Sequence, residues 1–206
     1  MKAAVIVFPG TNCDRDTRAA CEEFGWETDY VWHFEQSLDD YDVVFLPGGF
    51  SYGDYIRSGR LAKFSPVIEA VKKYVKAKRG FVIGICNGFQ ILCETGLLPG
   101  VLTDNRDTRF ICKKTGLKLN NSKEITLPIA HGEGRYIAEN IPKEMIFLTY
   151  TDNPNGSMED IAGLYDRENN IIGMMPHPER AFFAETGSTD GREIFKIVEE
   201  ALAVKK

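Results

Sequence analysis

One cysteine in this sequence stands where a nucleophile can be held, between two glycines that follow an apolar run. Cys86 lies in the segment Gly84-Ile-Cys-Asn-Gly-Phe-Gln90, after the apolar residues 81–85. A strand, a tight glycine-flanked turn and then a helix make a nucleophile elbow, in which glycine lets strand and helix pass without Cβ clashes. A cysteine after an apolar strand is more often a buried structural residue. The Gly-x-Cys-x-Gly spacing favours the nucleophile.

The neighbours of Cys86 would complete a site for an anionic intermediate. Cys86 would lie at a helix N-terminus, where the helix dipole and the free N–H groups stabilise negative charge. The N–H of Asn87 would point at an oxyanion formed when the sulfur attacks a carbonyl carbon. Gln90 is one helical turn beyond Cys86, so we expect its amide to face the same pocket.

A nucleophilic thiol needs a base, and the three histidines offer two candidates. His177 and Glu179 follow a predicted strand and could act as a base and the carboxylate that orients it, as in a Ser–His–Asp triad. A solvated loop is the common alternative for such a pair. His131 and Glu133 have the same spacing after a strand, and sequence order alone does not choose between the two pairs. His33, among aromatic residues, is interpreted as structural.

A glycine-rich loop, residues 46–59, follows the predicted strand at 42–46. Ligand sites in parallel sheets gather at the carboxyl ends of strands, so the N–H of Gly49 could reach the same oxyanion as Asn87. The loop matches neither a phosphate-binding Gly-Lys-Ser/Thr motif nor the dinucleotide Gly-x-Gly-x-x-Gly motif. A plain strand-to-helix connection is the alternative, but about a dozen residues is long for one.

The elements that must position these groups alternate in the first half of the chain. Strands are predicted at 3–8, 28–34, 42–46 and 81–85. Helices are predicted at 15–24, from Ser65-Pro66 onward, after Cys86 as far as Gly96, and at 192–204. This alternation indicates βαβ units and a parallel sheet.

The pattern changes in the second half, where shorter strands are joined by polar turns. They are predicted at 109–112, 124–130 and 145–150, followed by a hairpin of 161–165 with 171–175. We therefore expect an α/β fold, with an antiparallel extension of the parallel sheet. No repeat or linker divides the chain, which predicts a single domain over residues 1–206.

The composition limits the classes of function. Hydrophobic residues make up 43% and charged residues 27%, as in soluble globular proteins. The net charge of −5 argues against nucleic-acid binding. Five cysteines without a Cys-x-x-Cys pair suggest neither a zinc site nor a disulfide framework. No apolar run is long enough for a membrane span or a signal peptide, so we expect a cytoplasmic protein without membrane contact.

Taken together, Gly84-Ile-Cys-Asn-Gly-Phe-Gln90 and His177-Pro-Glu179 resemble the motifs of class I, triad-type glutamine amidotransferases. Longer segments extend the resemblance over nearly the whole chain, toward the glutaminase subunits of phosphoribosylformylglycinamidine synthases. These segments are Phe8-Pro-Gly-Thr-Asn-Cys-Asp14, Pro47-Gly-Gly-Phe-Ser-Tyr-Gly-Asp-Tyr-Ile-Arg57, Ala130-His-Gly-Glu-Gly-Arg-Tyr136, Asn153-Pro-Asn-Gly-Ser157 and Gly173-Met-Met-Pro-His-Pro-Glu-Arg180.

The resemblance implies a flavodoxin-like sheet with helices on both faces, and a Cys-His-Glu triad made of Cys86, His177 and Glu179. It further implies that Gly49 and Asn87 form the oxyanion hole. Residues that would bind the amino-acid end of glutamine are Gln90, Gly156 and Ser157.

The resemblance also implies the partners of the chain. Ammonia released from glutamine would pass to a separate synthetase chain, which uses ATP and magnesium to convert formylglycinamide ribonucleotide to its amidine in purine biosynthesis. A small accessory subunit is expected in the same complex. No cofactor or metal is expected in this chain, because nothing in it matches an ATP site.

Two other functions share part of the pattern. A different cysteine hydrolase on the same fold, such as a peptidase, would have the elbow but would not be expected to have Gln90 or the His-Pro-Glu segment. A non-catalytic regulatory subunit would typically lack the cysteine or the histidine, and both are present here. A glutaminase assay distinguishes the three functions.

Overall fold

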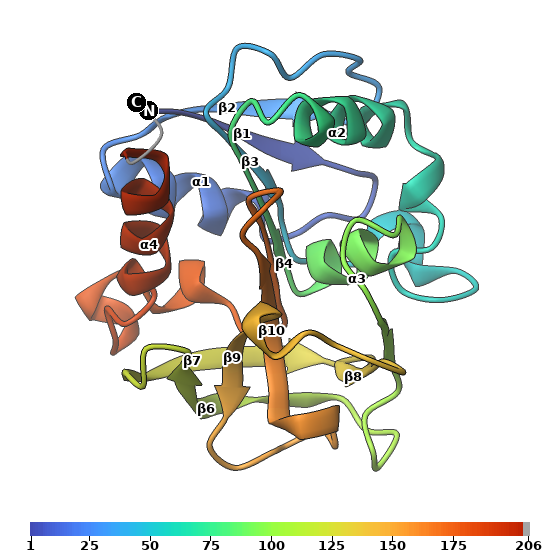
Figure 1. Ribbon diagram of the computed structural model, residues 1–206, viewed down its shortest axis with the longest axis vertical. Helices are drawn as coiled ribbons and strands as arrows, with labels where there is room; N and C mark the ends of the chain where they lie inside the picture. The colour runs from blue at the N-terminus through green and yellow to red at the C-terminus, as the bar shows by residue number, and fades with distance from the viewer. Residues whose placement is uncertain (204–206) are drawn as a thin grey trace.

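A mixed sheet of nine strands runs through the protein, in the order β2-β1-β3-β4-β11-β10-β9-β6-β7 (Figure 1). The computed structural model describes residues 1–203. Five neighbouring strands are parallel: β2 (Glu27–Trp32), β1 (Lys2–Val7), β3 (Val43–Leu46), β4 (Phe81–Ile85) and β11 (Ile171–Met174). The remaining four pair antiparallel: β10 (Ile161–Asp166), β9 (Ile146–Tyr150), β6 (Ile111–Leu119) and β7 (Glu124–His131). The predicted α/β fold with an antiparallel extension is confirmed.

Helices cover both faces of the parallel strands (Figure 1). One face carries α1 (Asp14–Glu23) and α4 (Arg192–Ala203), and the other carries α2 (Pro66–Lys76) and α3 (Asn87–Glu94). Ser65 takes the N-cap position of α2 and Pro66 its first position, as predicted. The predicted end of the last helix at Val204 lies outside the described residues. Among residues 1–203 we find no helix with the length and apolar character needed to cross a membrane.

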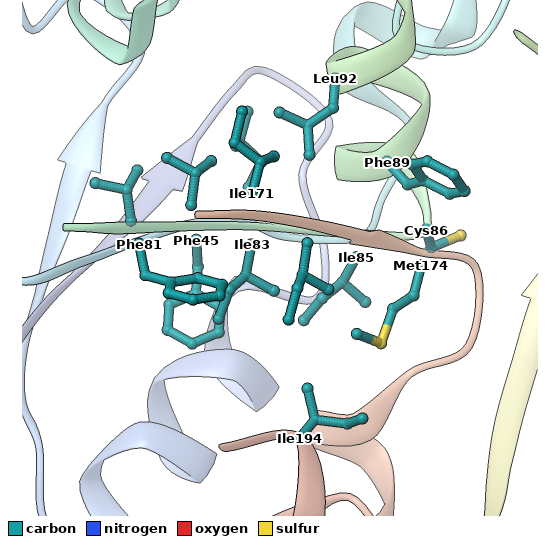
Figure 2. Close-up of a cluster of buried hydrophobic side chains, with 14 of the residues drawn as sticks. Phe45, Phe81, Ile83, Ile85, Cys86, Phe89, Leu92, Ile171, Met174 and Ile194 are labelled. Atoms are coloured by element: carbon teal, nitrogen blue, oxygen red, sulfur yellow. The ribbon is translucent and has the colours of Figure 1, made fainter. Parts of the chain in front are cut away.

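The core lies on both sides of the central strands, because β3 and β4 are buried along their whole length. Figure 2 shows Phe89 and Leu92 of α3 on one face of the sheet, and Phe45 and Ile83 on the other. On that second face the ring of Phe45 stacks on Phe195 of α4, with centroids 5.6 Å apart. Each buried side chain of this kind contributes about 1.5–3 kcal/mol through removal of apolar surface from water.

The antiparallel half differs from the predicted pattern. The predicted short strand at 109–112 overlaps β6 (Ile111–Leu119) only at residues 111–112. The rest of β6 was not predicted, because exposed lysines such as Lys113 and Lys114 conceal its strand character. Two short strands, β5 (Val101–Thr103) and β8 (Arg135–Ile137), form a separate sheet. This sheet was not predicted, because a segment of three residues is too short to show a strand pattern. Short 3₁₀ turns lie at Ser51–Asp54, Ala62–Phe64, Lys143–Met145, Met158–Asp160, Pro178–Ala181 and Ala184–Thr186.

The position of β11 decides what meets at the carboxyl edge of the sheet. Although it is the last strand in the chain, β11 lies beside β4, with Gly173 opposite Gly84 and Met174 opposite Ile85. Because the two strands are parallel, the segments that follow them leave the sheet at the same edge. Cys86 directly follows β4, and His177 comes three residues after β11. The sheet therefore brings together two groups that are distant in the sequence.

Candidate active site

Cys86 occupies a strained turn between β4 and α3. Its backbone has φ +52° and ψ −105°, a conformation that costs a non-glycine residue about 1–3 kcal/mol. The two flanking glycines are required by close approach, since a Cβ at Gly84 would lie 2.6 Å from the carbonyl oxygen of Gly88. The structure thus has the geometry of the predicted nucleophile elbow, with Cys86 as N-cap of α3 and Asn87 as its first residue.

His177 and Glu179 form a buried pair beside this turn. Nδ1 of His177 lies 2.7 Å from Oε1 of Glu179, and both side chains are almost completely inaccessible to solvent. Burial opposes protonation of His177, but the negative charges of Glu179 and of an ionised Cys86 outweigh it and raise the pKa of the imidazole well above its ordinary value. Nε2 of His177, the nitrogen not used by Glu179, has no hydrogen-bond partner among residues 1–203. The pair can therefore hold and transfer a proton at Nε2.

His131 also lies beside Cys86 but has different partners. Its Nδ1 lies 3.0 Å from Oδ1 of Asn105, whereas Glu133 accepts a hydrogen bond from the backbone N–H of Ser58 at 3.2 Å. Burial, followed by the charge of His177, lowers the pKa of His131 to about 4, so the ring is neutral at pH 7. The geometry therefore favours His177 as the base, because His131 lacks the carboxylate that would orient and charge it.

Two cavities meet at Cys86, and both are lined by Gly49, Phe50 and Ala130 as well. The first, about 200 Å³ in volume, continues along Asn12, Cys13, Phe110, His177 and Arg180 and is called here the His177-side cavity. The second, about 20 Å³, continues along residues that include Gln90, His131 and Glu133 and is called the Gln90-side cavity. The second has room for about one water molecule.

Hydrogen bonds close the Gln90-side cavity. The side-chain amide of Gln90 donates to the carbonyl oxygen of Glu133 at 2.6 Å. Asn87 donates to Oε1 of Gln90 at 2.9 Å and accepts from the backbone N–H of Ser51 at 3.1 Å. The side chain of Asn87 therefore ties the glycine-rich loop to α3. Sequence reasoning considered only its backbone N–H, since the contact joins residues that are far apart in the chain.

The remaining predicted site residues fall into two groups. Gly49 lies in the walls of both cavities with Cys86, in a φ +151° conformation that favours glycine, and its role in the oxyanion hole stays a prediction. Gly156 and Ser157 line neither cavity in the described part of the chain. They are joined to the site indirectly, since the Ser157 hydroxyl donates to the carbonyl oxygen of Gly134 at 3.5 Å. The structure does not bring these two residues to the nucleophile.

Cys13 and Arg180 are residues of the site to which the sequence assigned no role. Nη2 of Arg180 donates to Sγ of Cys13 at 2.9 Å, and Cys13 is the N-cap of α1. A Cβ at Gly48 would lie 2.8 Å from Cε1 of His177 and 2.9 Å from this sulfur, so only glycine lets the two side chains approach. The sequence feature that could have drawn attention to Cys13 is the Asn-Cys-Asp segment at residues 12–14. Its proximity to His177 could not be predicted, because it depends on the fold.

The thiol, imidazole and carboxylate groups of this site are of types that can bind a metal ion. Cys13, His177 and Glu179 bring potential ligand atoms within 4.8 Å of one another, and zinc accepts sulfur, nitrogen and oxygen ligands. However, Glu179 already engages Nδ1 of His177, and a cation bound to Cys13 would have to displace the guanidinium of Arg180. The arrangement is therefore better suited to proton transfer than to metal binding.

Comparison with known proteins adds independent findings. Residues 1–196 match the family model of the CobB/CobQ-like glutamine amidotransferase domain. A phosphoribosylformylglycinamidine synthase subunit PurQ from Gloeobacter violaceus is 48% identical, covering 99% of this chain and 100% of its own length. The PurQ subunit from Lacticaseibacillus casei is 50% identical, with 95% of this chain and 93% of its own length covered. A chain of the PurLQS structure from Thermotoga maritima has a TM-score of 0.92 at 41% identity, with 98% of both chains covered.

Proposed function

We propose that this chain, which belongs to the CobB/CobQ-like glutamine amidotransferase family, is the glutaminase subunit of a phosphoribosylformylglycinamidine synthase. It hydrolyses glutamine to glutamate and ammonia and delivers the ammonia to a synthetase. The observation that carries the reaction is the strained Cys86 at the start of α3, which lines one cavity with His177, whose Nδ1 is in contact with Glu179. The similarity to PurQ subunits over their full length supports the choice of synthase.

The chemistry follows from the positions of the groups. The sulfur of Cys86 attacks the side-chain amide carbon of glutamine, and the oxyanion that forms is met by the N–H groups of Gly49 and Asn87. His177 gives its Nε2 proton to the amide nitrogen as the carbon–nitrogen bond breaks, which releases ammonia and leaves a γ-glutamyl thioester. His177 then removes a proton from water, whose oxygen attacks the thioester carbon. The carbon–sulfur bond breaks, His177 returns the proton to the sulfur, and glutamate and the thiol are formed. Glu179 keeps the imidazole oriented in both steps.

The glutamine site is closed in the free chain. The amino-acid end of glutamine would be bound beside Gln90, but the Gln90-side cavity of about 20 Å³ has room for about one water molecule. Hydrogen bonds from Ser51 to Asn87 and from Ser58 to Glu133 hold the glycine-rich loop in place over it. Glutamine therefore binds only when this loop moves. We therefore expect the isolated chain to be a poor glutaminase that its partner activates.

Further parts of the proposal concern the complex. ATP and magnesium are used by the separate synthetase chain, and a small accessory subunit joins the two in the cytoplasm. The Tyr55 and Ile56 side chains, 73% and 81% exposed at the tip of the glycine-rich loop, are in a position to be contacted by a partner that moves it.

Glutaminase turnover of the purified chain, measured with and without its synthetase and nucleotide, tests the proposal. We expect slow glutamate release from the chain alone, and an increase of about a hundredfold or more in the complex, the size of effect that one oxyanion donor has. Glutamine-dependent formation of the amidine should require Cys86, whereas ammonium salts should support it without this residue. A complex that releases no glutamate from glutamine would refute the proposed function.

A further inference from the structure

The turn at residues 132–134, between β7 and β8, holds the side chain of Gln90. The backbone carbonyl oxygen of Glu133 accepts the hydrogen bond from Nε2 of Gln90 at 2.6 Å. Glycine stands on both sides of Glu133, and Gly134 has to be glycine because a Cβ there would lie 2.1 Å from Nδ1 of His131. Glycines give the backbone conformational freedom. Groups from other segments must therefore keep the Glu133 carbonyl in place.

Two buried asparagines bind the backbone of this turn. The side-chain oxygen of Asn105 accepts a hydrogen bond from the N–H of Gly134 at 3.1 Å, and the backbone N–H of Asn105 donates to the carbonyl oxygen of Gly132 at 2.9 Å. Nδ2 of Asn155 donates to the carbonyl oxygen of Gly134 at 2.7 Å. The two asparagines are 1% and 0% exposed. Every peptide group of the turn is held by one of them.

Asn155 is the more specialised of the two. Asn105 also binds the ring of His131, so its side chain serves two purposes. The orientation of the Asn155 amide is set by Ser157, whose N–H donates to Oδ1 of Asn155 at 3.0 Å and whose hydroxyl lies 2.8 Å from the same oxygen. Because both groups meet Oδ1, the donor Nδ2 faces the carbonyl oxygen of Gly134.

We propose that Asn155 is a positioning residue for glutamine, because it holds the turn at residues 132–134 so that the Glu133 carbonyl fixes the Gln90 amide. This inference rests on the proposed function, in which the amino-acid end of glutamine lies beside Gln90. The amide of Gln90 is bound at both of its polar atoms, since Oε1 accepts from Asn87 at 2.9 Å and Nε2 donates to Glu133. The second N–H of Nε2 is left for the substrate. Its direction depends on the position of the Glu133 carbonyl.

Asn155 acts on substrate binding and not on the breaking of bonds. It lines neither of the two cavities at Cys86 in the described part of the chain. Cys86 is held by the elbow, and His177 is oriented by Glu179, and neither contact involves the turn at residues 132–134. Loss of the Nδ2 donor should therefore weaken the binding of glutamine and leave the chemical steps intact. Such a change raises KM without lowering kcat.

Steady-state glutamate release by the assembled complex, measured as kcat and KM for glutamine, tests this inference. Asn155→Asp keeps the shape and the Oδ1 acceptor but replaces the donor with an oxygen that repels the Gly134 carbonyl. Asn155→Ala removes the donor without adding a charge. The matched control is Asn153→Asp, the same chemical change on the same loop. Asn153 binds the backbone of Gly156 and Ser157, and among residues 1–203 it has no hydrogen bond to the turn.

We expect both Asn155 variants to raise KM about tenfold and to keep kcat within about twofold of the wild type, the effect of losing one hydrogen bond that supports binding. Asn153→Asp should have a KM near that of the wild type. In a Gln90→Ala background, Asn155→Asp should raise KM no further, because the side chain through which Asn155 acts is absent.

Four results would overturn the role of Asn155 alone. They are an unchanged KM in the Asn155 variants, a fall in kcat at constant KM, an equal rise of KM in Asn153→Asp, and a rise in the double variant that adds to that of Gln90→Ala. A wild-type complex that releases no glutamate from glutamine would instead refute the proposed function, and this inference with it.

Discussion

Replacing His131 with asparagine should make the protein less sensitive to acid. His131 is buried beside His177, its Nδ1 is bound to Asn105, and its Nε2 has no hydrogen-bond partner in the described part of the chain. A proton on Nε2 would therefore be buried without an acceptor. For this reason the pKa of the ring is lowered from 6.5 to about 4 in the folded protein.

The sign and size of the effect follow from linkage. Between about pH 6.5 and pH 4 the unfolded chain binds a proton at His131 and the folded chain does not, so the free energy of unfolding falls as the pH falls. At about pH 5 the loss is 1.5 pH units at 1.36 kcal/mol each, or about 2 kcal/mol, relative to pH 7. His177 contributes with the opposite sign, because its raised pKa favours the folded state in acid, but this contribution is present in both proteins.

Urea denaturation at about pH 7 and about pH 5 measures the free energy of unfolding of the wild type and of His131→Asn. Asparagine keeps an N–H for the Asn105 carbonyl, so its cost in packing should be the same at both pH values. We expect the wild type to lose about 2 kcal/mol more than His131→Asn between them. If both proteins lose the same amount, His131 is not held neutral and the reasoning from its burial is refuted.

Three further predictions concern catalysis, measured as steady-state glutamate release by the complex and, for Cys86→Ala, also as ammonia-dependent formation of the amidine. Cys86→Ala should abolish glutamine-dependent activity and leave ammonia-dependent synthesis intact; loss of both would contradict the separation of the two activities. His177→Ala should lower turnover at least about a thousandfold, and His131→Asn should lower it much less. A larger loss of turnover in His131→Asn than in His177→Ala would identify His131 as the base. Gly48→Ala should lower turnover about a hundredfold, because the new Cβ, 2.8 Å from His177, must displace the ring. Circular dichroism should show that the fold is retained. Full activity would mean that the ring moves without consequence.

Features encoded within a few residues could be predicted from the sequence. The elbow at Cys86 is an example, because the strand, the glycine spacing and the helix are adjacent in the chain. The parallel half of the sheet could be predicted for the same reason, since each strand and helix has its own periodic pattern. The antiparallel half could be predicted less well, because β6 contains the consecutive exposed residues 112–114 and the strands β5 and β8 have three residues each.

Contacts between distant segments could not be predicted. The choice between His131 and His177 depends on which neighbour reaches Nδ1, and Asn105 is 26 residues from His131. The proximity of Cys13 to Arg180 joins residues 167 positions apart. Nothing in the local sequence of either residue specifies its partner. Such contacts are fixed only when the sheet has assembled and its carboxyl edge has brought the loops together.

The central position of β11 has a consequence for protein synthesis. Cys86 and its strand leave the ribosome about 90 residues before His177, and β11 must then insert between β4 and β10, which have already been translated. A nascent chain that has folded its first four parallel strands holds the thiol but not the base. With His177 as the proposed base, unfinished chains should not hydrolyse cellular glutamine, and a chain truncated by premature termination or proteolysis before β11 should be inert.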